Sequence, residues 1–199
     1  MANLALNINM HGRVALVVGG GHVACRKVKS LLASGACVHV VASVIEPEIT
    51  ELAESEAVSV RLGCYRADDL ENIFLAVAAT DNAEVNRQIA SDAAQIGILV
   101  AVADNPELGN CTFPAMLRRG DLEIGVSTGG RSPSFAVAVR NMLAGLVDER
   151  FAEALDSMAA IREKLLTEGK ASQYNNKVLR EKARLKLAEL TEITKERVI

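Results

Sequence analysis

The amino-acid sequence predicts an α/β fold, with a parallel sheet in the first half of the chain and a small α+β region and a helical region after it. Up to about residue 104, short apolar runs alternate with helical patterns, as expected for repeated strand–helix–strand units. Hydrophobic residues make up 50% of the 199 residues, but aromatic residues only 3%. Aliphatic side chains therefore carry the core, as they do in parallel sheets that are buried on both faces.

The first half is expected to contain five strands and three helices. The strands are predicted at residues 14–18, 37–42, 58–62, 74–79 and 98–103, and the helices at 23–33, 46–55 and 82–95. Gly35 and Gly97 follow the first and third of these helices, as helix-terminating glycines do. Parallel strands joined by right-handed crossovers favour the strand order 3-2-1-4-5, which is the Rossmann-like arrangement.

The alternation ends after residue 104, and a different organisation is expected. Apolar runs at 111–117 and 122–127 predict a hairpin, with Arg118 and Arg119 solvated at its tip. Ser132 and Pro133 then have the N-cap and first-turn positions of a helix over 135–146. From Asp148 the pattern is helical and broken only at Gly169. Its apolar positions form a stripe of the kind that packs on the body of a protein or on a second subunit: Phe151, Leu155, Met158, Ile161 and Leu165.

Composition and charge exclude several classes of protein. The formal net charge is −3, which argues against a general nucleic-acid-binding surface. The sequence shows neither a secretory signal nor an apolar run of membrane-spanning length, so we expect a cytoplasmic protein with no membrane partner. Cysteines and histidines lack metal-ligand spacing, so no metal site is expected. We interpret the four cysteines as buried, reduced thiols: Cys25, Cys37, Cys64 and Cys111.

A glycine-rich turn follows the first predicted strand. Gly19, Gly21 and Ala24 match the dinucleotide-binding pattern G-x-G-x-x-[G/A]. Such glycines let the backbone turn tightly and approach a pyrophosphate, while the first amides of the next helix, at His22 and Val23, face the anion. The alternative is a plain strand-to-helix turn. Because a strand and a helix flank the turn as the pattern requires, we favour nucleotide binding.

The end of the second predicted strand lacks the acidic residue that usually binds the ribose of NAD. The segment there contains Ser43 and Val44, and Glu46 falls in the next predicted helix. Ser43, or the backbone beside it, could bind a ribose hydroxyl instead. No Arg or Lys stands there to hold a 2′-phosphate, so the segment favours NAD over NADP only weakly.

Two more polar segments follow the ends of predicted strands, where ligands of open α/β sheets bind. Thr80 and Asp81 would border the cofactor, although Asp81 or Asn82 could equally cap the following helix. Asp104 could accept a proton or orient a substrate. The alternative for Asp104 is an ordinary Asp-Asn-Pro turn.

A third candidate segment precedes the helix at 135–146. Its amides, hydroxyls and arginine could bind carboxylates, and the alternative is a glycine loop with a capped helix. The residues concerned are Thr128, Gly129, Gly130, Arg131 and Ser132.

Five motifs across residues 9–147 together resemble the precorrin-2 dehydrogenase family, which includes the amino-terminal part of siroheme synthase. The first is the glycine turn at residues 17–27, and the second is residues 78–82 with Asn86. The others are residues 102–106, residues 113–115 and residues 126–133. The order and spacing of the motifs match as well as their residues.

The resemblance implies NAD-dependent oxidation of precorrin-2, a polycarboxylate tetrapyrrole, to sirohydrochlorin by a homodimer. It implies that Asp104 is the acid–base residue and that the loop at Thr128 contributes to the tetrapyrrole site. The family generally lacks the acid after the second strand. The domains implied are an NAD-binding domain over 1–112, a dimerisation hairpin and helix over 113–148, and a helical region over 149–199.

The chain departs from the family pattern at Ala101, where relatives commonly have Asn. This puts a local hydrogen bond in doubt, but not Asp104 itself. Two alternative functions stay open. The first is a bifunctional enzyme that also inserts ferrous iron to give siroheme, as some relatives do. The second is a nucleotide-sensing module without catalysis, which would need neither Asp104 nor the loop at 127–133.

Overall fold

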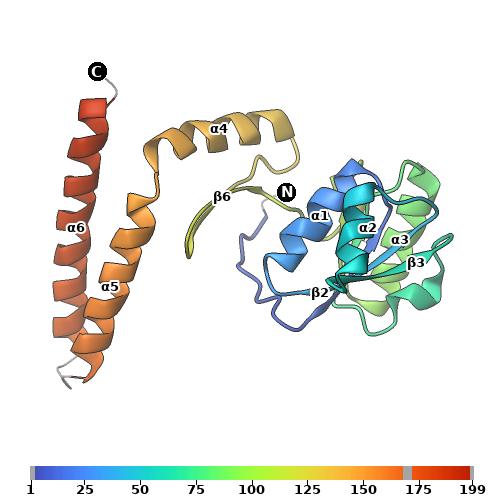
Figure 1. Ribbon diagram of the computed structural model, residues 1–199, viewed down its shortest axis with the longest axis horizontal. Coiled ribbons are helices and arrows are strands. Elements are labelled where there is room, and N and C mark those ends of the chain that lie inside the picture. The colour runs from blue at the N-terminus through green and yellow to red at the C-terminus, as the bar shows by residue number, and fades with distance from the viewer. Residues whose placement is uncertain (1–2, 168–171, 198–199) are drawn as a thin grey trace. The chain divides into compact units, whose positions relative to one another are not determined.

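The computed structural model describes residues 3–167 and 172–197, and its elements are drawn in Figure 1. The chain divides into two compact units, Met1–Phe113 and Pro114–Ile199. The first unit holds the parallel sheet, and the second holds the hairpin and the long helices.

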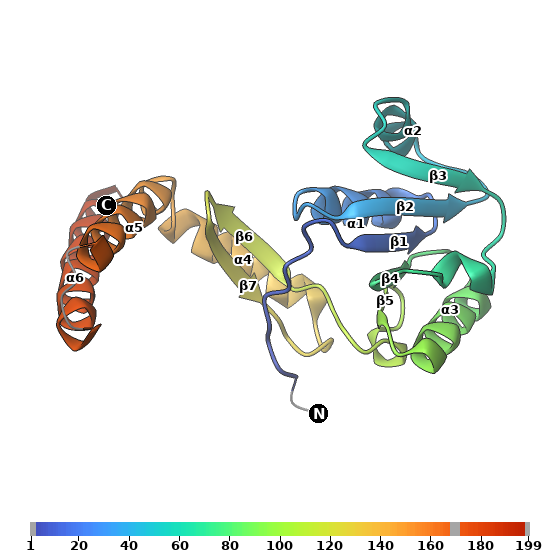
Figure 2. The same cartoon turned by 90° about the horizontal axis from the view of Figure 1, so that it is seen from below.

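The first unit is built on a five-stranded parallel sheet with the order β3-β2-β1-β4-β5 (Figure 2). The predicted order 3-2-1-4-5 is therefore confirmed. The first three strands have the predicted bounds, and the last two are one residue shorter at each end. The strands are β1 (Val14–Val18), β2 (Cys37–Ala42), β3 (Val58–Leu62), β4 (Leu75–Ala78) and β5 (Leu99–Val102).

Three helices connect the strands of this unit. They are α1 (His22–Leu32), α2 (Pro47–Glu54) and α3 (Ala83–Ile96), with short 3₁₀ turns η1 (Ala67–Leu70) and η2 (Pro106–Leu108). Side chains of β1 alternate between the two faces of the sheet, because successive strand residues point in opposite directions. Ala15 and Val17 pack with the apolar faces of α1 and α2, whereas Leu16 and Val18 pack with α3. Helices thus cover both faces, and the carboxyl ends of the strands form the edge where ligands of such sheets bind.

The second unit begins with the hairpin of β6 (Ala115–Arg119) and β7 (Leu122–Val126), followed by α4 (Pro133–Leu146). The first hairpin strand starts later than predicted because the amide of Cys111 donates to the carbonyl of Val100 in β5, which holds this part of the chain against the large sheet. The helices α5 (Arg150–Thr167) and α6 (Ser172–Arg197) pack against each other. The helix α5 therefore has a partner within the tail, although Leu155 of the predicted apolar stripe is exposed. The predicted break at Gly169 lies outside the described residues.

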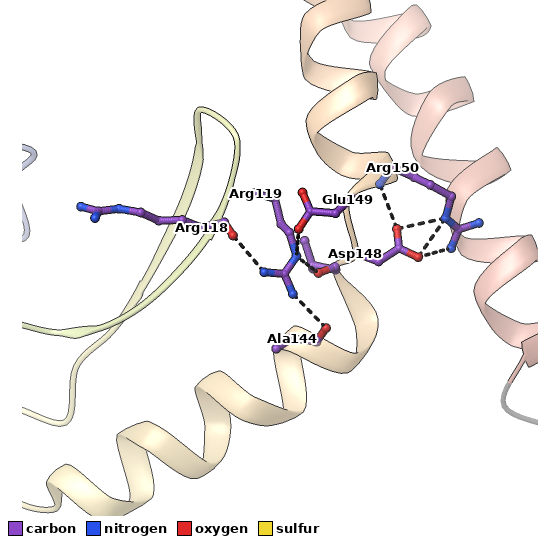
Figure 3. Close-up of polar contacts among 7 residues, drawn as sticks. Arg118, Arg119, Ala144, Asp148, Glu149 and Arg150 are labelled. Carbon is purple, nitrogen blue, oxygen red and sulfur yellow. Dashed lines mark hydrogen bonds and ion pairs between the residues drawn. The ribbon is translucent and has the colours of Figure 1, made fainter. Parts of the chain in front are cut away.

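Arg119 links the hairpin to the end of α4 (Figure 3). Its guanidinium donates to the carbonyl oxygens of Val147 at 3.0 Å and Ala144 at 3.4 Å, and Nε lies 3.4 Å from a carboxylate oxygen of Glu149. The last carbonyls of a helix have no partner within the helix and carry its negative end, so a cation there is stabilising. The prediction that Arg119 is solvated is wrong for this reason. Arg118 instead pairs with Glu123 across the hairpin, at 2.7 Å.

The four cysteines are all free, but they are not all buried as predicted. Cys25 lies in the core, because α1 turns that face toward the sheet, and burial raises the pKa of its thiol. Cys37 begins β2 and Cys64 follows β3, and both are exposed. None of the described helices combines the length and hydropathy needed to cross a membrane.

Candidate functional site

The turn after β1 requires glycine, because other backbone segments lie close to it. Gly19 has φ +123°, and a Cβ built on it would lie 2.3 Å from the carbonyl oxygen of Ala79. A Cβ on Gly20 would lie 2.0 Å from the carbonyl oxygen of Val44. Both positions therefore exclude any side chain. At Gly21 a Cβ would meet nothing within 4 Å, so this residue borders open space.

The N-terminus of α1 is left without a side-chain cap. Gly21 is the N-cap residue, and no side chain in the described parts of the chain accepts a hydrogen bond from the first turn. By contrast, α3 is capped by Asn82, whose Oδ1 accepts from the amides of Glu84 and Val85. The first amides of α1, those of His22 and Val23, thus point from the positive end of a helix dipole into the space beside Gly21. This arrangement fits a dinucleotide pyrophosphate.

The segment after β2 lies directly against this turn. Ser43 and Val44 are exposed, while the amide of Glu46 donates to the carbonyl of Gly20 over 2.8 Å. The sequence placed Glu46 inside the next helix, but it is the N-cap residue of α2, whose first helical residue is Pro47. The Oε1 atom of Glu46 lies 3.6 Å from Nε2 of His22. The acidic group is thus beside the start of α1.

The ends of β4 and β5 are joined by one buried amide side chain. Asn86 on α3 is fully buried and is the one buried polar side chain among the described residues. Its Oδ1 accepts from the amide and hydroxyl of Thr80, at 3.2 and 2.7 Å, and its Nδ2 donates to the carbonyl of Thr80 at 3.0 Å. Nδ2 also donates to Oδ1 of Asp104 at 2.9 Å. Two loops from neighbouring strands are thereby fixed to each other.

Asn86 had a place in the motifs of the sequence but no role. The sequence could have indicated a role for Asn86, because it is a polar residue within the apolar stripe of its helix. Ile89, Ala90 and Ala93 lie on the same buried face. A buried amide must satisfy its donors and acceptors. The Asn86 side chain does so with Thr80, which follows β4, and with the carboxylate of Asp104, which follows β5. Asp81 is exposed and Asn82 caps α3.

The loop from Thr128 to Ser132 belongs to the second unit. The Thr128 hydroxyl donates to the carbonyl of Ser132 at 3.0 Å and accepts from its amide at 3.1 Å. The Ser132 hydroxyl caps α4 by accepting from the amide of Phe135. Gly129 and Gly130 have φ of 61° and 80°, which glycine adopts without strain. Both hydroxyls therefore stabilise the loop, and Arg131 is exposed.

Lys27 is a half-buried cation to which the sequence motifs assign no role. Its Nζ lies 4.0 Å from the ring centroid of Phe113. Burial, with the nearby charge of Arg26, lowers the pKa of Lys27 to about 8. Burial likewise raises the pKa of the Cys111 thiol to about 11. Within the described parts of the chain, no three His, Cys, Asp or Glu side chains are grouped so as to hold a metal ion.

Comparison with known proteins gives consistent matches. The family described as "Putative NAD(P)-binding" matches residues 6–115. The siroheme synthase of Nitrosomonas europaea is 38% identical over 168 residues, which cover 83% of this chain and 35% of that protein. The chain spans about a third of the length of the siroheme synthases that it matches.

Two relatives correspond in length as well. The precorrin-2 dehydrogenase of Bacillus subtilis is 32% identical over 161 residues, which cover 81% of this chain and 99% of that protein. The solved structure of SirC, a precorrin-2 dehydrogenase, superposes with a TM-score of 0.75 at 27% identity, covering 96% of this chain and all of that one.

Proposed function

The chain belongs to the precorrin-2 dehydrogenase family, and we propose that it oxidises precorrin-2 to sirohydrochlorin with NAD as the hydride acceptor. The observation that carries this proposal is the pairing of an exposed carboxylate, Asp104, with a buried amide, Asn86, at the ligand-binding edge of a nucleotide-binding sheet. A nucleotide sensor would need the glycine turn but not this carboxylate.

The first unit is an NAD(P)-binding domain, and its glycine turn fits the cofactor. Gly19 and Gly21 shape the turn, and the amides of His22 and Val23 hold the pyrophosphate. Ser43 and Val44 on one side, and Thr80 and Asp81 on the other, border the nucleotide. The bound cofactor supplies the hydride acceptor, and the protein supplies position and charge.

Asp104 is the proposed acid–base residue. Formation of sirohydrochlorin removes one hydride and one proton from precorrin-2, and the products are NADH and H⁺. The Asp104 carboxylate receives the proton, while the hydrogen bond from Asn86 fixes its orientation. A carboxylate on an otherwise exposed loop would sample many orientations, so this hydrogen bond contributes preorganisation.

The loop of the second unit is proposed to bind the carboxylates of the substrate. Arg131 offers an exposed guanidinium, which forms strong paired hydrogen bonds with carboxylates. Thr128, Gly129, Gly130 and Ser132 give the loop its shape.

We also propose a cytoplasmic homodimer. One face of the helix α4 carries large exposed apolar side chains, at Phe135, Met142 and Leu146. An apolar face of this kind is typical of a surface that a second subunit covers. The free cysteines, two of them exposed, suit a reducing compartment.

The test is the reaction itself. Purified protein, precorrin-2 and NAD should yield NADH and sirohydrochlorin in equal amounts, followed by absorbance. If the protein binds NADH but produces no NADH from NAD and authentic precorrin-2, the proposal is contradicted and a nucleotide sensor is favoured. A parallel reaction of sirohydrochlorin with ferrous iron tests the alternative of an additional iron-inserting activity.

A further inference from the structure

Glu46 is far from the glycine turn in sequence but adjacent to it in the fold. Its amide donates to the carbonyl of Gly20 at 2.8 Å, and the carbonyl of Val44 occupies the place where a side chain on Gly20 would stand. The segment from Val44 to Glu46 is therefore pressed against the turn that follows β1. Small rearrangements of this segment would break the close backbone packing, so the position of Glu46 is fixed.

The side chain of Glu46 is available to a ligand. As the N-cap residue of α2 it could accept hydrogen bonds from the first turn of that helix, but its carboxylate caps no amide. It extends instead toward α1, where Oε1 lies 3.6 Å from Nε2 of His22. His22 is the first residue of α1, and its side chain is 91% exposed. The Glu46 side chain is 32% exposed, and its carboxylate lies beside the helix end that fits the pyrophosphate.

We propose that Glu46 is the acidic residue that binds the adenosine ribose and selects NAD over NADP. In Rossmann-like domains an acid that follows the second strand accepts a hydrogen bond from the ribose 2′-hydroxyl. Here β2 ends at Ala42 and is followed by Ser43 and Val44, and the carboxylate comes from the N-cap of the next helix. The 2′-phosphate of NADP would place its negative charge against the same carboxylate, and like charges at such distances repel strongly.

Glu48 provides a matched control two residues further along the chain, in the first turn of α2. It is also acidic, but its carboxylate is engaged by Lys29 of α1 and accepts a hydrogen bond from Cys25. Its removal changes the local charge by the same amount as removal of Glu46. A general effect of net charge on dinucleotide binding would therefore appear in both Glu46→Gln and Glu48→Gln. The loss of a direct contact with the ribose would appear in Glu46→Gln only.

The inference rests on the proposed function, but its test needs no tetrapyrrole substrate. Binding of NADH and of NADPH is measured by titration calorimetry for the intact chain and for Glu46→Gln, Glu46→Asp and Glu48→Gln. We expect the unaltered chain to bind NADH at least about tenfold more tightly than NADPH, and Glu46→Gln to bring that ratio near one, since a charged hydrogen bond is worth about tenfold or more. Glu46→Asp should give an intermediate ratio, and Glu48→Gln should stay within about twofold of the original.

Two results would overturn the inference and are distinguishable. A Glu46→Gln protein that keeps the original ratio of affinities overturns the role of Glu46 and leaves the proposed dehydrogenase intact. An unaltered chain that binds neither dinucleotide overturns the role of Glu46 together with the proposed function. Circular dichroism of each variant shows that the fold is retained.

Discussion

The Nδ2 atom of Asn86 donates a hydrogen bond to Oδ1 of Asp104 over 2.9 Å, and so connects a fully buried side chain to an exposed one. The other hydrogen bonds of the Asn86 side chain all join it to Thr80. The amide therefore couples the loops after β4 and β5, which are neighbouring strands of the sheet. The proposed catalytic carboxylate gains a fixed orientation from a residue that no substrate can reach.

Replacing Asn86 with Ala should lower kcat for precorrin-2 oxidation by about 10- to 100-fold, because the carboxylate of Asp104 loses its orientation. The affinity for NADH should change little. The variant should also lose about 1–3 kcal/mol of unfolding free energy, since the amide of Thr80 loses its acceptor.

Asn110→Ala is the control for that loss of stability. The Asn110 side chain accepts from the amide of Val100 at 2.8 Å and donates to the carbonyl of Ile98 at 2.9 Å, along β5. The Asn110→Ala variant should be destabilised to a similar extent. Assayed below its melting temperature, it should nevertheless keep kcat within about twofold of that of the unaltered chain. If both variants lost kcat equally, Asn86 would have only a structural role.

Asp104→Asn should abolish turnover and leave cofactor binding unchanged. The replacement has the same shape and can still accept the hydrogen bond of Asn86, but it accepts no proton. General base catalysis contributes about 10²–10⁴-fold, so kcat should fall at least a hundredfold while the dissociation constant for NADH stays the same. Steady-state kinetics and calorimetry measure the two quantities. Activity near that of the unaltered chain would refute the assignment.

Gly20 and Gly21 should respond differently to replacement by Ala. At Gly20 the added methyl would lie 2.0 Å from the backbone of Val44, so we expect a loss of more than about 2 kcal/mol in unfolding free energy. At Gly21 the methyl meets no protein atom within 4 Å, so the variant should fold normally. It should nevertheless bind NADH at least about tenfold more weakly, because the methyl occupies the cofactor's side of the turn. Denaturant unfolding and calorimetry separate the two effects, and unchanged NADH affinity in Gly21→Ala would place the cofactor elsewhere.

The protein should gain stability from Lys27 as the pH rises from about 8 toward the pKa of a free lysine. Burial lowers the pKa of Lys27 to about 8 in the folded state, so between these values the unfolded chain binds more protons than the folded chain. Stability then rises with pH. The gain should be about 1–2 kcal/mol after allowance for partial solvent exposure.

Lys27→Met isolates this contribution from other groups that titrate in the same range, such as Cys111, whose raised pKa acts in the opposite direction. Chemical denaturation at several pH values should show the difference in unfolding free energy between the two proteins changing by that amount. A constant difference would mean that Lys27 has an ordinary pKa.

Arg119→Ala should destabilise the second unit by about 1–3 kcal/mol, because two carbonyls near the end of α4 lose a charged donor. Arg118→Ala removes the same charge from the neighbouring position. It breaks only a half-exposed pair with Glu123, and should cost no more than about 0.5 kcal/mol. Hydrogen exchange of α4 and thermal unfolding report the effect. Equal losses in the two variants would show that the contacts of Arg119 contribute nothing specific.

Local patterns in the sequence predicted most of the secondary structure and the order of the large sheet. The aliphatic runs of β1, β2 and β3 are bounded by glycines and polar turns, and these signals are local in the chain. The glycine turn could be recognised because Gly19 and Gly21 precede the first turn of α1. The roles of these residues and of the loop at Thr128 stay predictions.

Which side chains contact each other depends on how the elements pack in three dimensions. Asn86 and Asp104 are 18 residues apart, and they touch because β4 and β5 are paired and α3 packs beneath their ends. Glu46 lies in a different strand–helix unit from Gly20, and Arg119 lies in a hairpin whose sequence predicts a solvated tip. Each contact depends on the register and packing of two elements, and hydrophobic periodicity within one element carries no information about the other. For this reason the sequence indicated where a site would form, and the fold determined which groups compose it.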